Sequence, residues 1–95
     1  MYPNYRDKLH TLPPHMHGAI VRWIERGIRP GDFLTALLSN DLMEAFGRAD
    51  DQNTAAMQNW VIYLHNYAPI GCFGSPAKFQ AWHEQGGLCI EEQAA

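Results

Sequence analysis

The sequence has few of the features that usually mark a catalytic, metal-binding or exported protein. It holds two cysteines, Cys72 and Cys89, and neither lies in a Cys-x-x-Cys pair. Two isolated cysteines exclude a disulfide framework and predict reduced thiols that are buried or idle. No apolar run approaches the ~20 residues that span a bilayer, and residues 1–10 show no apolar signal segment. We therefore expect a soluble, cytoplasmic protein without a membrane contact.

Basic side chains are also scarce. Seven lysines and arginines stand against ten acidic residues, which gives a formal net charge of −3. Most of the imbalance lies in residues 49–95, which carry Lys78 as their single basic side chain and five acidic ones. A protein that binds duplex nucleic acid normally presents a basic stripe that neutralises phosphates. We therefore expect no direct binding to duplex nucleic acid, and an acidic second half.

The chain does contain enough apolar material for one core. Hydrophobic residues make up 46% and charged residues 18% of its 95 residues, which indicates a single folded domain. Residues 1–10 lack periodicity and are expected to form an arm that Tyr2 and Tyr5 anchor on the domain or on a neighbouring subunit. The helical domain is expected to span residues 11–87, and a tail to follow over residues 88–95.

Apolar residues recur with the helical period of 3.6, and no stretch alternates with a period of two. Together with glycine and proline punctuation, this pattern predicts an all-α fold, a small bundle of four to five helices. The first helix is expected to begin at the N-cap Thr11 and to end at Gly27. Its expected core positions are Met16, Ile20, Trp23 and Ile24, with Arg22, Glu25 and Arg26 facing solvent.

The second helix is expected to follow the N-cap Asp32 and to start at Phe33. Its apolar pattern suits one helix up to the stop at Gly47, whereas Ser39-Asn40-Asp41 favours a break near Asn40. Both readings stay open. The expected apolar stripe is Leu34, Leu37, Leu38, Leu42, Ala45 and Phe46.

Two further helices are expected in the second half. One starts at Asp50 and continues to Tyr67, before Pro69 forbids continuation. Ser75 and Pro76 open the last helix as N-cap and first helical residue, and Gly86-Gly87 ends it. The stripe expected on the first of these helices is Ala56, Met57, Trp60, Val61, Leu64 and Ala68, with Tyr63 off it.

None of the polar side chains forms a recognisable catalytic or metal signature. The five histidines lack the local pairs of a zinc site, and a hydrolase with a composite site of His15, Cys72, His83 and Cys89 is the least favoured hypothesis. Ser75 lacks the G-x-S-x-G context of a nucleophile. The acidic residues Asp41, Glu44, Asp50 and Asp51 stand where helix starts favour negative charge. We expect no catalytic residue, no metal and no cofactor.

Arginines near helix starts allow two interpretations. Arg48, between two helices, is expected to clamp the end of one helix or the carboxylates of Asp50 or Asp41. Alternatively, Arg29, Arg48 and Lys78 could help helix N-termini to bind a phosphate, with Gly71-x-x-Gly74 forming a nest.

The segments PGDFLTALLSNDLMEAFGRADDQN and APIGCFGSPAKFQAW carry a family resemblance. They resemble a group of small uncharacterised proteins from bacteriophages, prophages and other mobile elements, which share the Pro-Gly-x-Phe-Leu start, the Asn-Asp-Leu centre, the Gly-Arg-Ala-Asp junction and the Gly-Ser-Pro-x-Lys helix start. The resemblance covers roughly Leu12 to Gly86. It implies a mobile-element origin and a non-enzymatic role inside a bacterial host cell, either in blocking host machinery or in capturing host defence signals.

Three hypotheses follow from these observations. In the first, a phage-encoded protein binds and inhibits a host defence complex, as an anti-CRISPR protein does, through acidic side chains. The residues expected to contact that partner are Glu44, Asp50, Asp51 and Glu84, with Glu91 and Glu92 in the tail. In the second, a homo-oligomer sequesters a small nucleotide signal. The residues expected to bind it are Arg29, Arg48, Asn53, Tyr63 and Trp82. In the third, the protein is a structural or regulatory phage module without a ligand.

Overall fold

A computed structural model describes residues 5–88, which contain six α-helices, two short 3₁₀ helices and no strand. This confirms the predicted all-α class. The 3₁₀ helices are η1 (Leu9–Thr11) and η2 (Pro14–Met16), and the α-helices are α1 (His17–Arg26), α2 (Asp32–Leu38), α3 (Leu42–Arg48), α4 (Asp51–Ala55), α5 (Met57–Asn66) and α6 (Pro76–Gln85).

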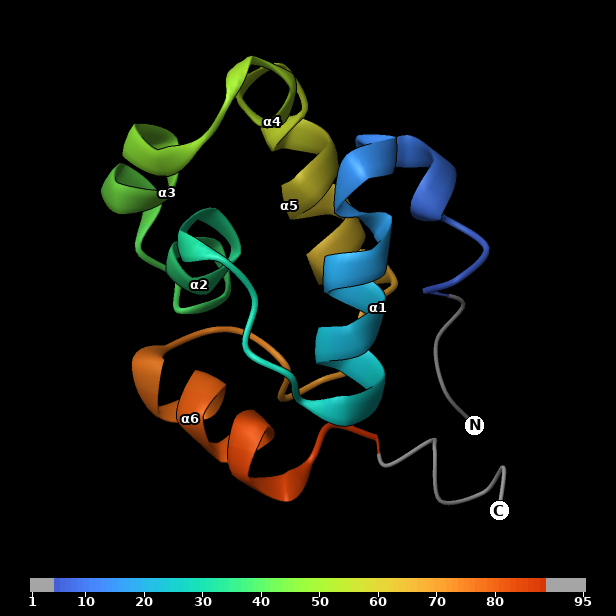
Figure 1. Ribbon diagram of the computed structural model, residues 1–95, viewed down its shortest axis with the longest axis vertical. Helices are drawn as coiled ribbons and strands as arrows, with labels where there is room; N and C mark the ends of the chain where they lie inside the picture. Colours follow the sequence, from blue (N-terminus) through green and yellow to red (C-terminus); the bar gives the residue numbers. More distant parts are fainter. Residues whose placement is uncertain (1–4, 89–95) are drawn as a thin grey trace.

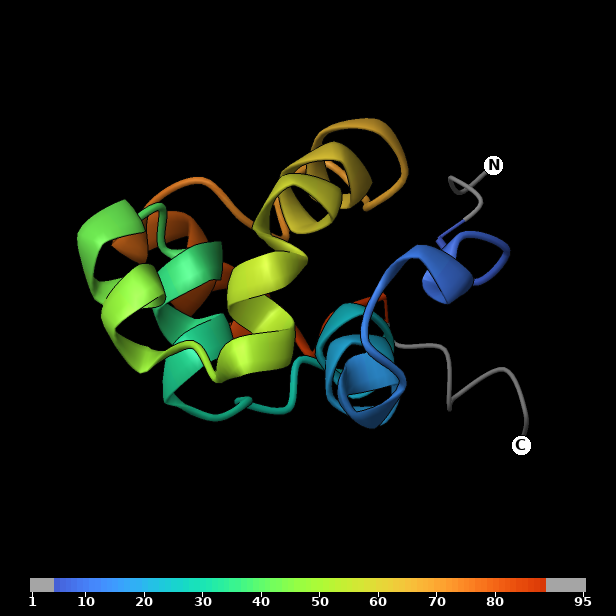
Figure 2. The ribbon, with the colours of Figure 1, turned by 90° about the horizontal axis from the view of Figure 1, so that it is seen from above.

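Helices α2 and α3 pack against each other on one side of the molecule, and α1 lies on the other side with the N-terminal segment outside it (Figure 1 and Figure 2). Helix α6 contacts α2 and lies at the end opposite α4 (Figure 1). The apolar side chains that fill the centre come from most of these elements. The largest of the fully buried ones are Trp23, Trp60, Tyr63, Ile20, Ile24, Leu34, Leu38 and Cys72.

The three indole N–H groups each find a buried acceptor, as buried tryptophans require. Trp23 Nε1 donates to the Cys72 carbonyl at 2.9 Å, and Trp82 Nε1 donates to the Trp23 carbonyl at 2.9 Å. Trp60 Nε1 donates to Asn53 Oδ1 at 3.0 Å. The first two bonds join α1, α6 and the loop before α6, and the third joins α5 to α4.

The first helix starts later than predicted. Thr11 does not cap it, because its hydroxyl donates to the Lys8 carbonyl at 2.8 Å, and α1 begins at His17 after two 3₁₀ helices. The cause is the pair Pro13-Pro14: each ring removes a backbone donor, and a residue before proline avoids the helical region. The predicted stop at Gly27 is confirmed, since its φ is +68°.

Glu25 is buried, so the prediction that it faces solvent is wrong. Its Oε2 accepts from Tyr5 Oη at 2.9 Å and from Arg6 Nε at 2.7 Å. Tyr63 Oη in turn donates to the Tyr5 carbonyl at 2.8 Å. The N-terminal segment, from Tyr5 onward, therefore lies on the domain and covers α1 and α5. Tyr2, the other expected anchor, lies outside the described residues.

The boundaries of α2 and α3 differ from the prediction at the start of α2 and at the end of α3. They also show whether the chain breaks between the two helices. Gly31, not Asp32, is the N-cap of α2, and Gly47 lies inside α3 instead of ending it. The helix does break near Asn40, which adopts the left-handed conformation with a φ of +64°. Asn is one of the few residues that tolerate this conformation.

The segment from Asp50 to Tyr67 is not one helix, because a turn at Ala56 separates α4 from α5. The expected cap is confirmed: Asp50 Oδ1 accepts from the Asn53 N–H at 2.7 Å. The burial predicted along α5 is wrong at two positions, since Val61 is 52% exposed and Tyr63 is fully buried. The predicted cap of α6 at Ser75 and its stop at Gly86 are confirmed.

Two buried phenols and a buried thiol make the stability of the domain depend on pH in the alkaline range. Burial raises the pKa of Tyr5 to about 12 and that of the Cys72 thiol to about 12, and it raises the pKa of Tyr63 above its ordinary range. Each of these groups keeps its proton to a higher pH in the folded chain than in the unfolded chain.

We expect the free energy of unfolding to fall as the pH rises above about 9, because the folded protein then binds more protons than the unfolded one. The contribution is complete below the ordinary pKa of 9.0 for the thiol and 10.0 for the phenols, and it is lost as the pH approaches about 12. Urea unfolding midpoints across this range measure it. Cys72→Ala should remove the earliest part of the decline, and a constant midpoint would contradict the burial of these groups.

Candidate functional site

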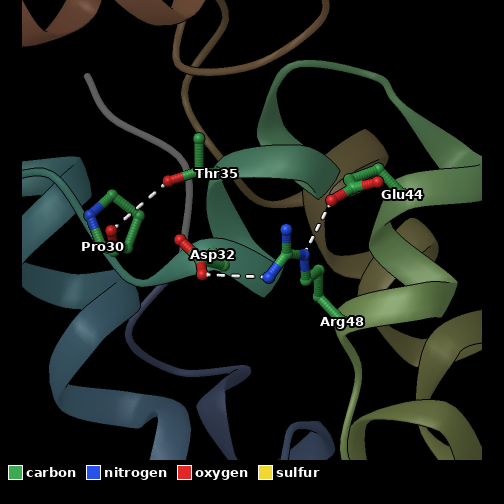
Figure 3. A network of polar contacts seen from close by, with 5 residues as sticks. All are labelled: Pro30, Asp32, Thr35, Glu44 and Arg48. Carbon is green, nitrogen blue, oxygen red and sulfur yellow. Dashed lines mark hydrogen bonds and ion pairs between the residues drawn. The ribbon is translucent and has the colours of Figure 1, made fainter.

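Helix α3 is held by a cap at its start and a clamp at its end. Asp41 Oδ1 accepts from the Glu44 N–H at 3.2 Å, so the capping-box spacing of these two residues functions as a helix start. Arg48 donates from Nε to Glu44 Oε2 at 2.7 Å and from an η nitrogen to Asp32 Oδ2 at 3.4 Å (Figure 3). The hydrogen bond to Glu44 raises the pKa of the Arg48 guanidinium.

Arg48 therefore acts as the predicted clamp, but with partners other than the expected Asp50 and Asp41. It links α3 to the first turn of α2, where Thr35 Oγ1 also donates to the Pro30 carbonyl at 3.3 Å (Figure 3). Because these groups are exposed, each ion pair adds little to stability. They link α3 to α2 in the orientation that the packing of the two helices gives.

This orientation turns apolar side chains of α3 outward. Met43 is 85% exposed, Leu42 54% and Phe46 46%, and Ala45 is the one buried residue of the helix. We call Leu42, Met43 and Phe46 the α3 face. The predicted burial of Leu42 and Phe46 is wrong, because the left-handed residue Asn40 changes the direction of the chain between α2 and α3. Clustered exposed apolar side chains are typical of protein interaction sites.

A groove runs from the α3 face to α5. Its volume is about 170 Å³, and we call it the α3–α5 groove. Leu42 and Val61 line it from opposite helices, and the polar side chains of Asn40, Asp41 and His65 belong to its lining. The remaining lining residues are Leu37, Leu64 and Phe73. The groove is thus mainly apolar, with one carboxylate at the helix start.

The four carboxylates expected to contact a partner do not form one surface. Glu44 lies on α3 and pairs with Arg48. Asp50 and Asp51 stand at the start of α4, where Asp50 caps the helix and its Oδ2 contacts His15 Nε2 at 2.9 Å. The hydrogen bond from the Asn53 N–H lowers the pKa of Asp50.

Glu84 is separate from the other three carboxylates. It lies on α6, and α6 and α4 are at opposite ends of the molecule (Figure 1). Its Oε2 accepts from Gln80 Nε2 at 2.9 Å. Glu91 and Glu92 lie outside the described residues. An acidic interface is therefore limited to the α3 and α4 region, with Glu44, Asp50 and Asp51.

The five residues expected to bind a nucleotide are also dispersed. Tyr63 is fully buried and Trp82 is 5% exposed, so neither ring offers a free face for stacking on a base. Asn53 is buried and its side chain accepts from Trp60. Arg29 donates to Gln80 Oε1 at 2.7 Å, whereas Arg48 engages α2 and α3. This arrangement gives the nucleotide hypothesis no assembled site.

The histidines and cysteines are likewise separated. His83 Nδ1 contacts the Gly27 carbonyl at 2.8 Å, His15 pairs with Asp50, and Cys72 is fully buried. Cys89, the fourth member of the composite site, lies outside the described residues. Within residues 5–88, no group of three or more His, Cys, Asp and Glu side chains is placed to hold a metal ion.

Comparisons with known proteins add no relative: no family model, curated protein or solved structure matches the chain. In the part of the chain that the structure describes, every helix is too short or too polar to cross a membrane. The candidate site consequently rests on the geometry of the α3 face and the α3–α5 groove.

Sequence reasoning missed Met43, which is the most exposed residue of the α3 face. The signal that could have found it is Ser39-Asn40-Asp41. If the helix breaks there, the apolar stripe of α2 no longer continues in phase into α3, so Leu42 and Met43 in its first turn lose their predicted direction.

Proposed function

We propose that this protein is a non-enzymatic interaction protein of phage origin that binds and inhibits a host defence complex, as anti-CRISPR proteins do. It would act in the cytoplasm of the bacterial host cell. The observation that carries the proposal is the α3 face, where Leu42, Met43 and Phe46 present large apolar side chains to solvent beside the α3–α5 groove.

Two further observations support a protein partner. The α3 face lies on a capped and clamped helix, so its backbone needs no ordering when a partner docks, which favours binding. Apolar side chains with exposed carboxylates near them also match the usual pattern of an apolar interface centre and a polar rim. Here Glu44 and Asp41 supply that rim. The phage origin and the defence target come from the sequence resemblance.

Met43→Glu should abolish the inhibition, because it places a charge on the α3 face at its most exposed residue, where a partner would have to desolvate it. The measurement is plaque formation by a phage on bacteria whose guide-directed nuclease restricts that phage, with each nuclease type tested in turn. The wild-type chain should restore plaques and the variant should not. Because Met43 is 85% exposed, its replacement should leave the thermal unfolding midpoint almost unchanged.

Ile28→Glu is the matched control. Ile28 is also a large apolar residue, 45% exposed, but it lies between α1 and α2, outside the α3 face. The Ile28→Glu variant should inhibit the host defence as strongly as the wild type does. Equal inhibition by the Met43→Glu variant and the wild type would remove the α3 face from the proposal. Failure of the wild type against every nuclease type would refute the defence target.

A further inference from the structure

We infer that the α3–α5 groove binds one large apolar side chain, presented by a basic amphipathic helix of a protein partner. This inference rests on the proposed function and specifies the chemistry of the partner. Five of the eight residues that line the groove are apolar. They are Leu37, Leu42, Val61, Leu64 and Phe73. The groove volume of about 170 Å³ is close to that of an apolar cavity of about 150 Å³ that holds one benzene ring.

The charge at the groove selects a basic partner. Asp41 is exposed, and its Oδ1 accepts the capping bond from Glu44, while its Oδ2 has no hydrogen-bond partner among residues 5–88. The groove lining contains no lysine or arginine, and the whole chain has a formal net charge of −3. A lysine or arginine one turn away from the inserted apolar side chain could therefore pair with the free oxygen of Asp41.

The shape of the site favours a helix as the element that presents this side chain. The groove lies between α5 and the turn that joins α2 to α3, and its apolar lining continues onto the α3 face through Leu42. An amphipathic helix that binds such a groove inserts one side chain into it. The apolar side chains three or four residues before or after that one then lie on the adjoining surface. Met43 and Phe46 supply that adjoining surface.

A second copy of this chain fits the groove less well. In a symmetric dimer the same patch meets itself, so a residue near the centre faces its own copy or a close neighbour. That arrangement would bring Asp41 and Glu44 of one copy close to the same acidic side chains of the other. Like charges brought together at an interface oppose association.

A designed peptide tests the inference directly. The probe is a capped, fluorescein-labelled, alanine-based helix with one central phenylalanine and a lysine four residues on either side of it. It should bind the full chain in fluorescence anisotropy and shift the methyl NMR signals of Val61 and Leu64. Replacing the phenylalanine by alanine should weaken binding about tenfold or more, since the burial of the ring is lost. Replacing the lysines by glutamates should also weaken it.

The protein offers a matched pair of variants on α5. Val61 lines the groove and is 52% exposed, whereas its neighbour Ile62 is 42% exposed and lies outside the groove lining. Val61→Gln should weaken binding of the phenylalanine peptide about fivefold, because a polar group replaces apolar contact area. Ile62→Gln should leave it unchanged, and both variants keep the charge of the chain.

Several outcomes would overturn the inference. They are no binding of the phenylalanine peptide at millimolar concentration, equal binding of the glutamate peptide, equal effects of the two α5 variants, or a stable dimer that Val61→Gln dissociates. The plaque assay separates this inference from the proposed function. If Met43→Glu abolishes inhibition but the peptide fails to bind, only the groove inference falls; if the peptide binds but no defence is inhibited, only the proposed function falls.

Discussion

Trp23→Ala is expected to lower the free energy of unfolding by about 4 kcal/mol or more, because it empties the centre of the core. The indole is fully buried on α1 and stacks on Phe79 of α6, with 4.4 Å between ring centroids. Its Nε1 also donates to the Cys72 carbonyl, which would lose this partner. Small domains are stable by only about 5–15 kcal/mol, so this variant should lose a large share of its stability and unfold at a much lower urea concentration than the wild type.

Urea denaturation followed by far-UV circular dichroism measures the effect. Trp23→Phe is the informative control, because it keeps an aromatic ring against Phe79 but removes the donor to the Cys72 carbonyl. It should cost less than the alanine variant, about 1–3 kcal/mol. A loss below about 1 kcal/mol for Trp23→Ala would mean that α1 and α6 do not share this core.

Gly87→Ala should cost about 3 kcal/mol or more, because a side chain has no space where the ends of α1 and α6 meet. Gly87 has a φ of +66°, which costs a residue with a Cβ about 1–2 kcal/mol. A Cβ at this position would also lie 2.6 Å from the Ile24 carbonyl oxygen and 2.7 Å from the Gly27 backbone nitrogen. Forcing packed backbone apart adds about 1–3 kcal/mol.

Gly47→Ala provides the opposite control. Gly47 lies inside α3, has no atom within 4 Å of an added Cβ, and is absent from the positive-φ glycines of the described chain. Alanine there should stabilise the protein by roughly 0.5–1 kcal/mol, because it restricts the unfolded chain. Urea midpoints of both variants test the pair. The same change in both would show that the ends of α1 and α6 are not in backbone contact.

Five helix ends were predictable from the sequence because their causes are local. Asp41 and Asp50 each accept from the backbone N–H three residues later, and Ser75 does the same for Lys78. Gly27 and Gly86 stop their helices in the left-handed conformation. Each of these interactions lies within a few residues, so residue type and spacing are enough to indicate it.

Some local signals competed, and the sequence could not rank them. Ser39-Asn40-Asp41 opposed an unbroken apolar pattern, and the structure favours the break. Gly47 resembled a helix stop, yet α3 continues to Arg48, because the helical region is also open to glycine. Pro13-Pro14 resembled a helix start, yet it delays α1 to His17.

The candidate site was the least predictable part of the protein. Its apolar residues Leu42 and Phe46 fit a core stripe, and Val61 fits the stripe of the next helix. They are half exposed in the fold because α3 turns away after Asn40 and because the buried side of α5, which carries Trp60 and Tyr63, faces Phe33 and Tyr5 instead. A buried and an exposed apolar stripe have the same spacing in sequence.

By itself, the sequence determined the helical class and several of the helix ends, because periodicity and capping act between near neighbours. Only the tertiary structure decided which apolar faces are covered. Tyr63 is buried because its hydroxyl reaches Tyr5, 58 residues earlier in the chain, and Glu25 is buried because the same segment folds over α1. Met43 stays in solvent because no described segment of the chain covers α3 there, since burial depends on partners that are distant in sequence.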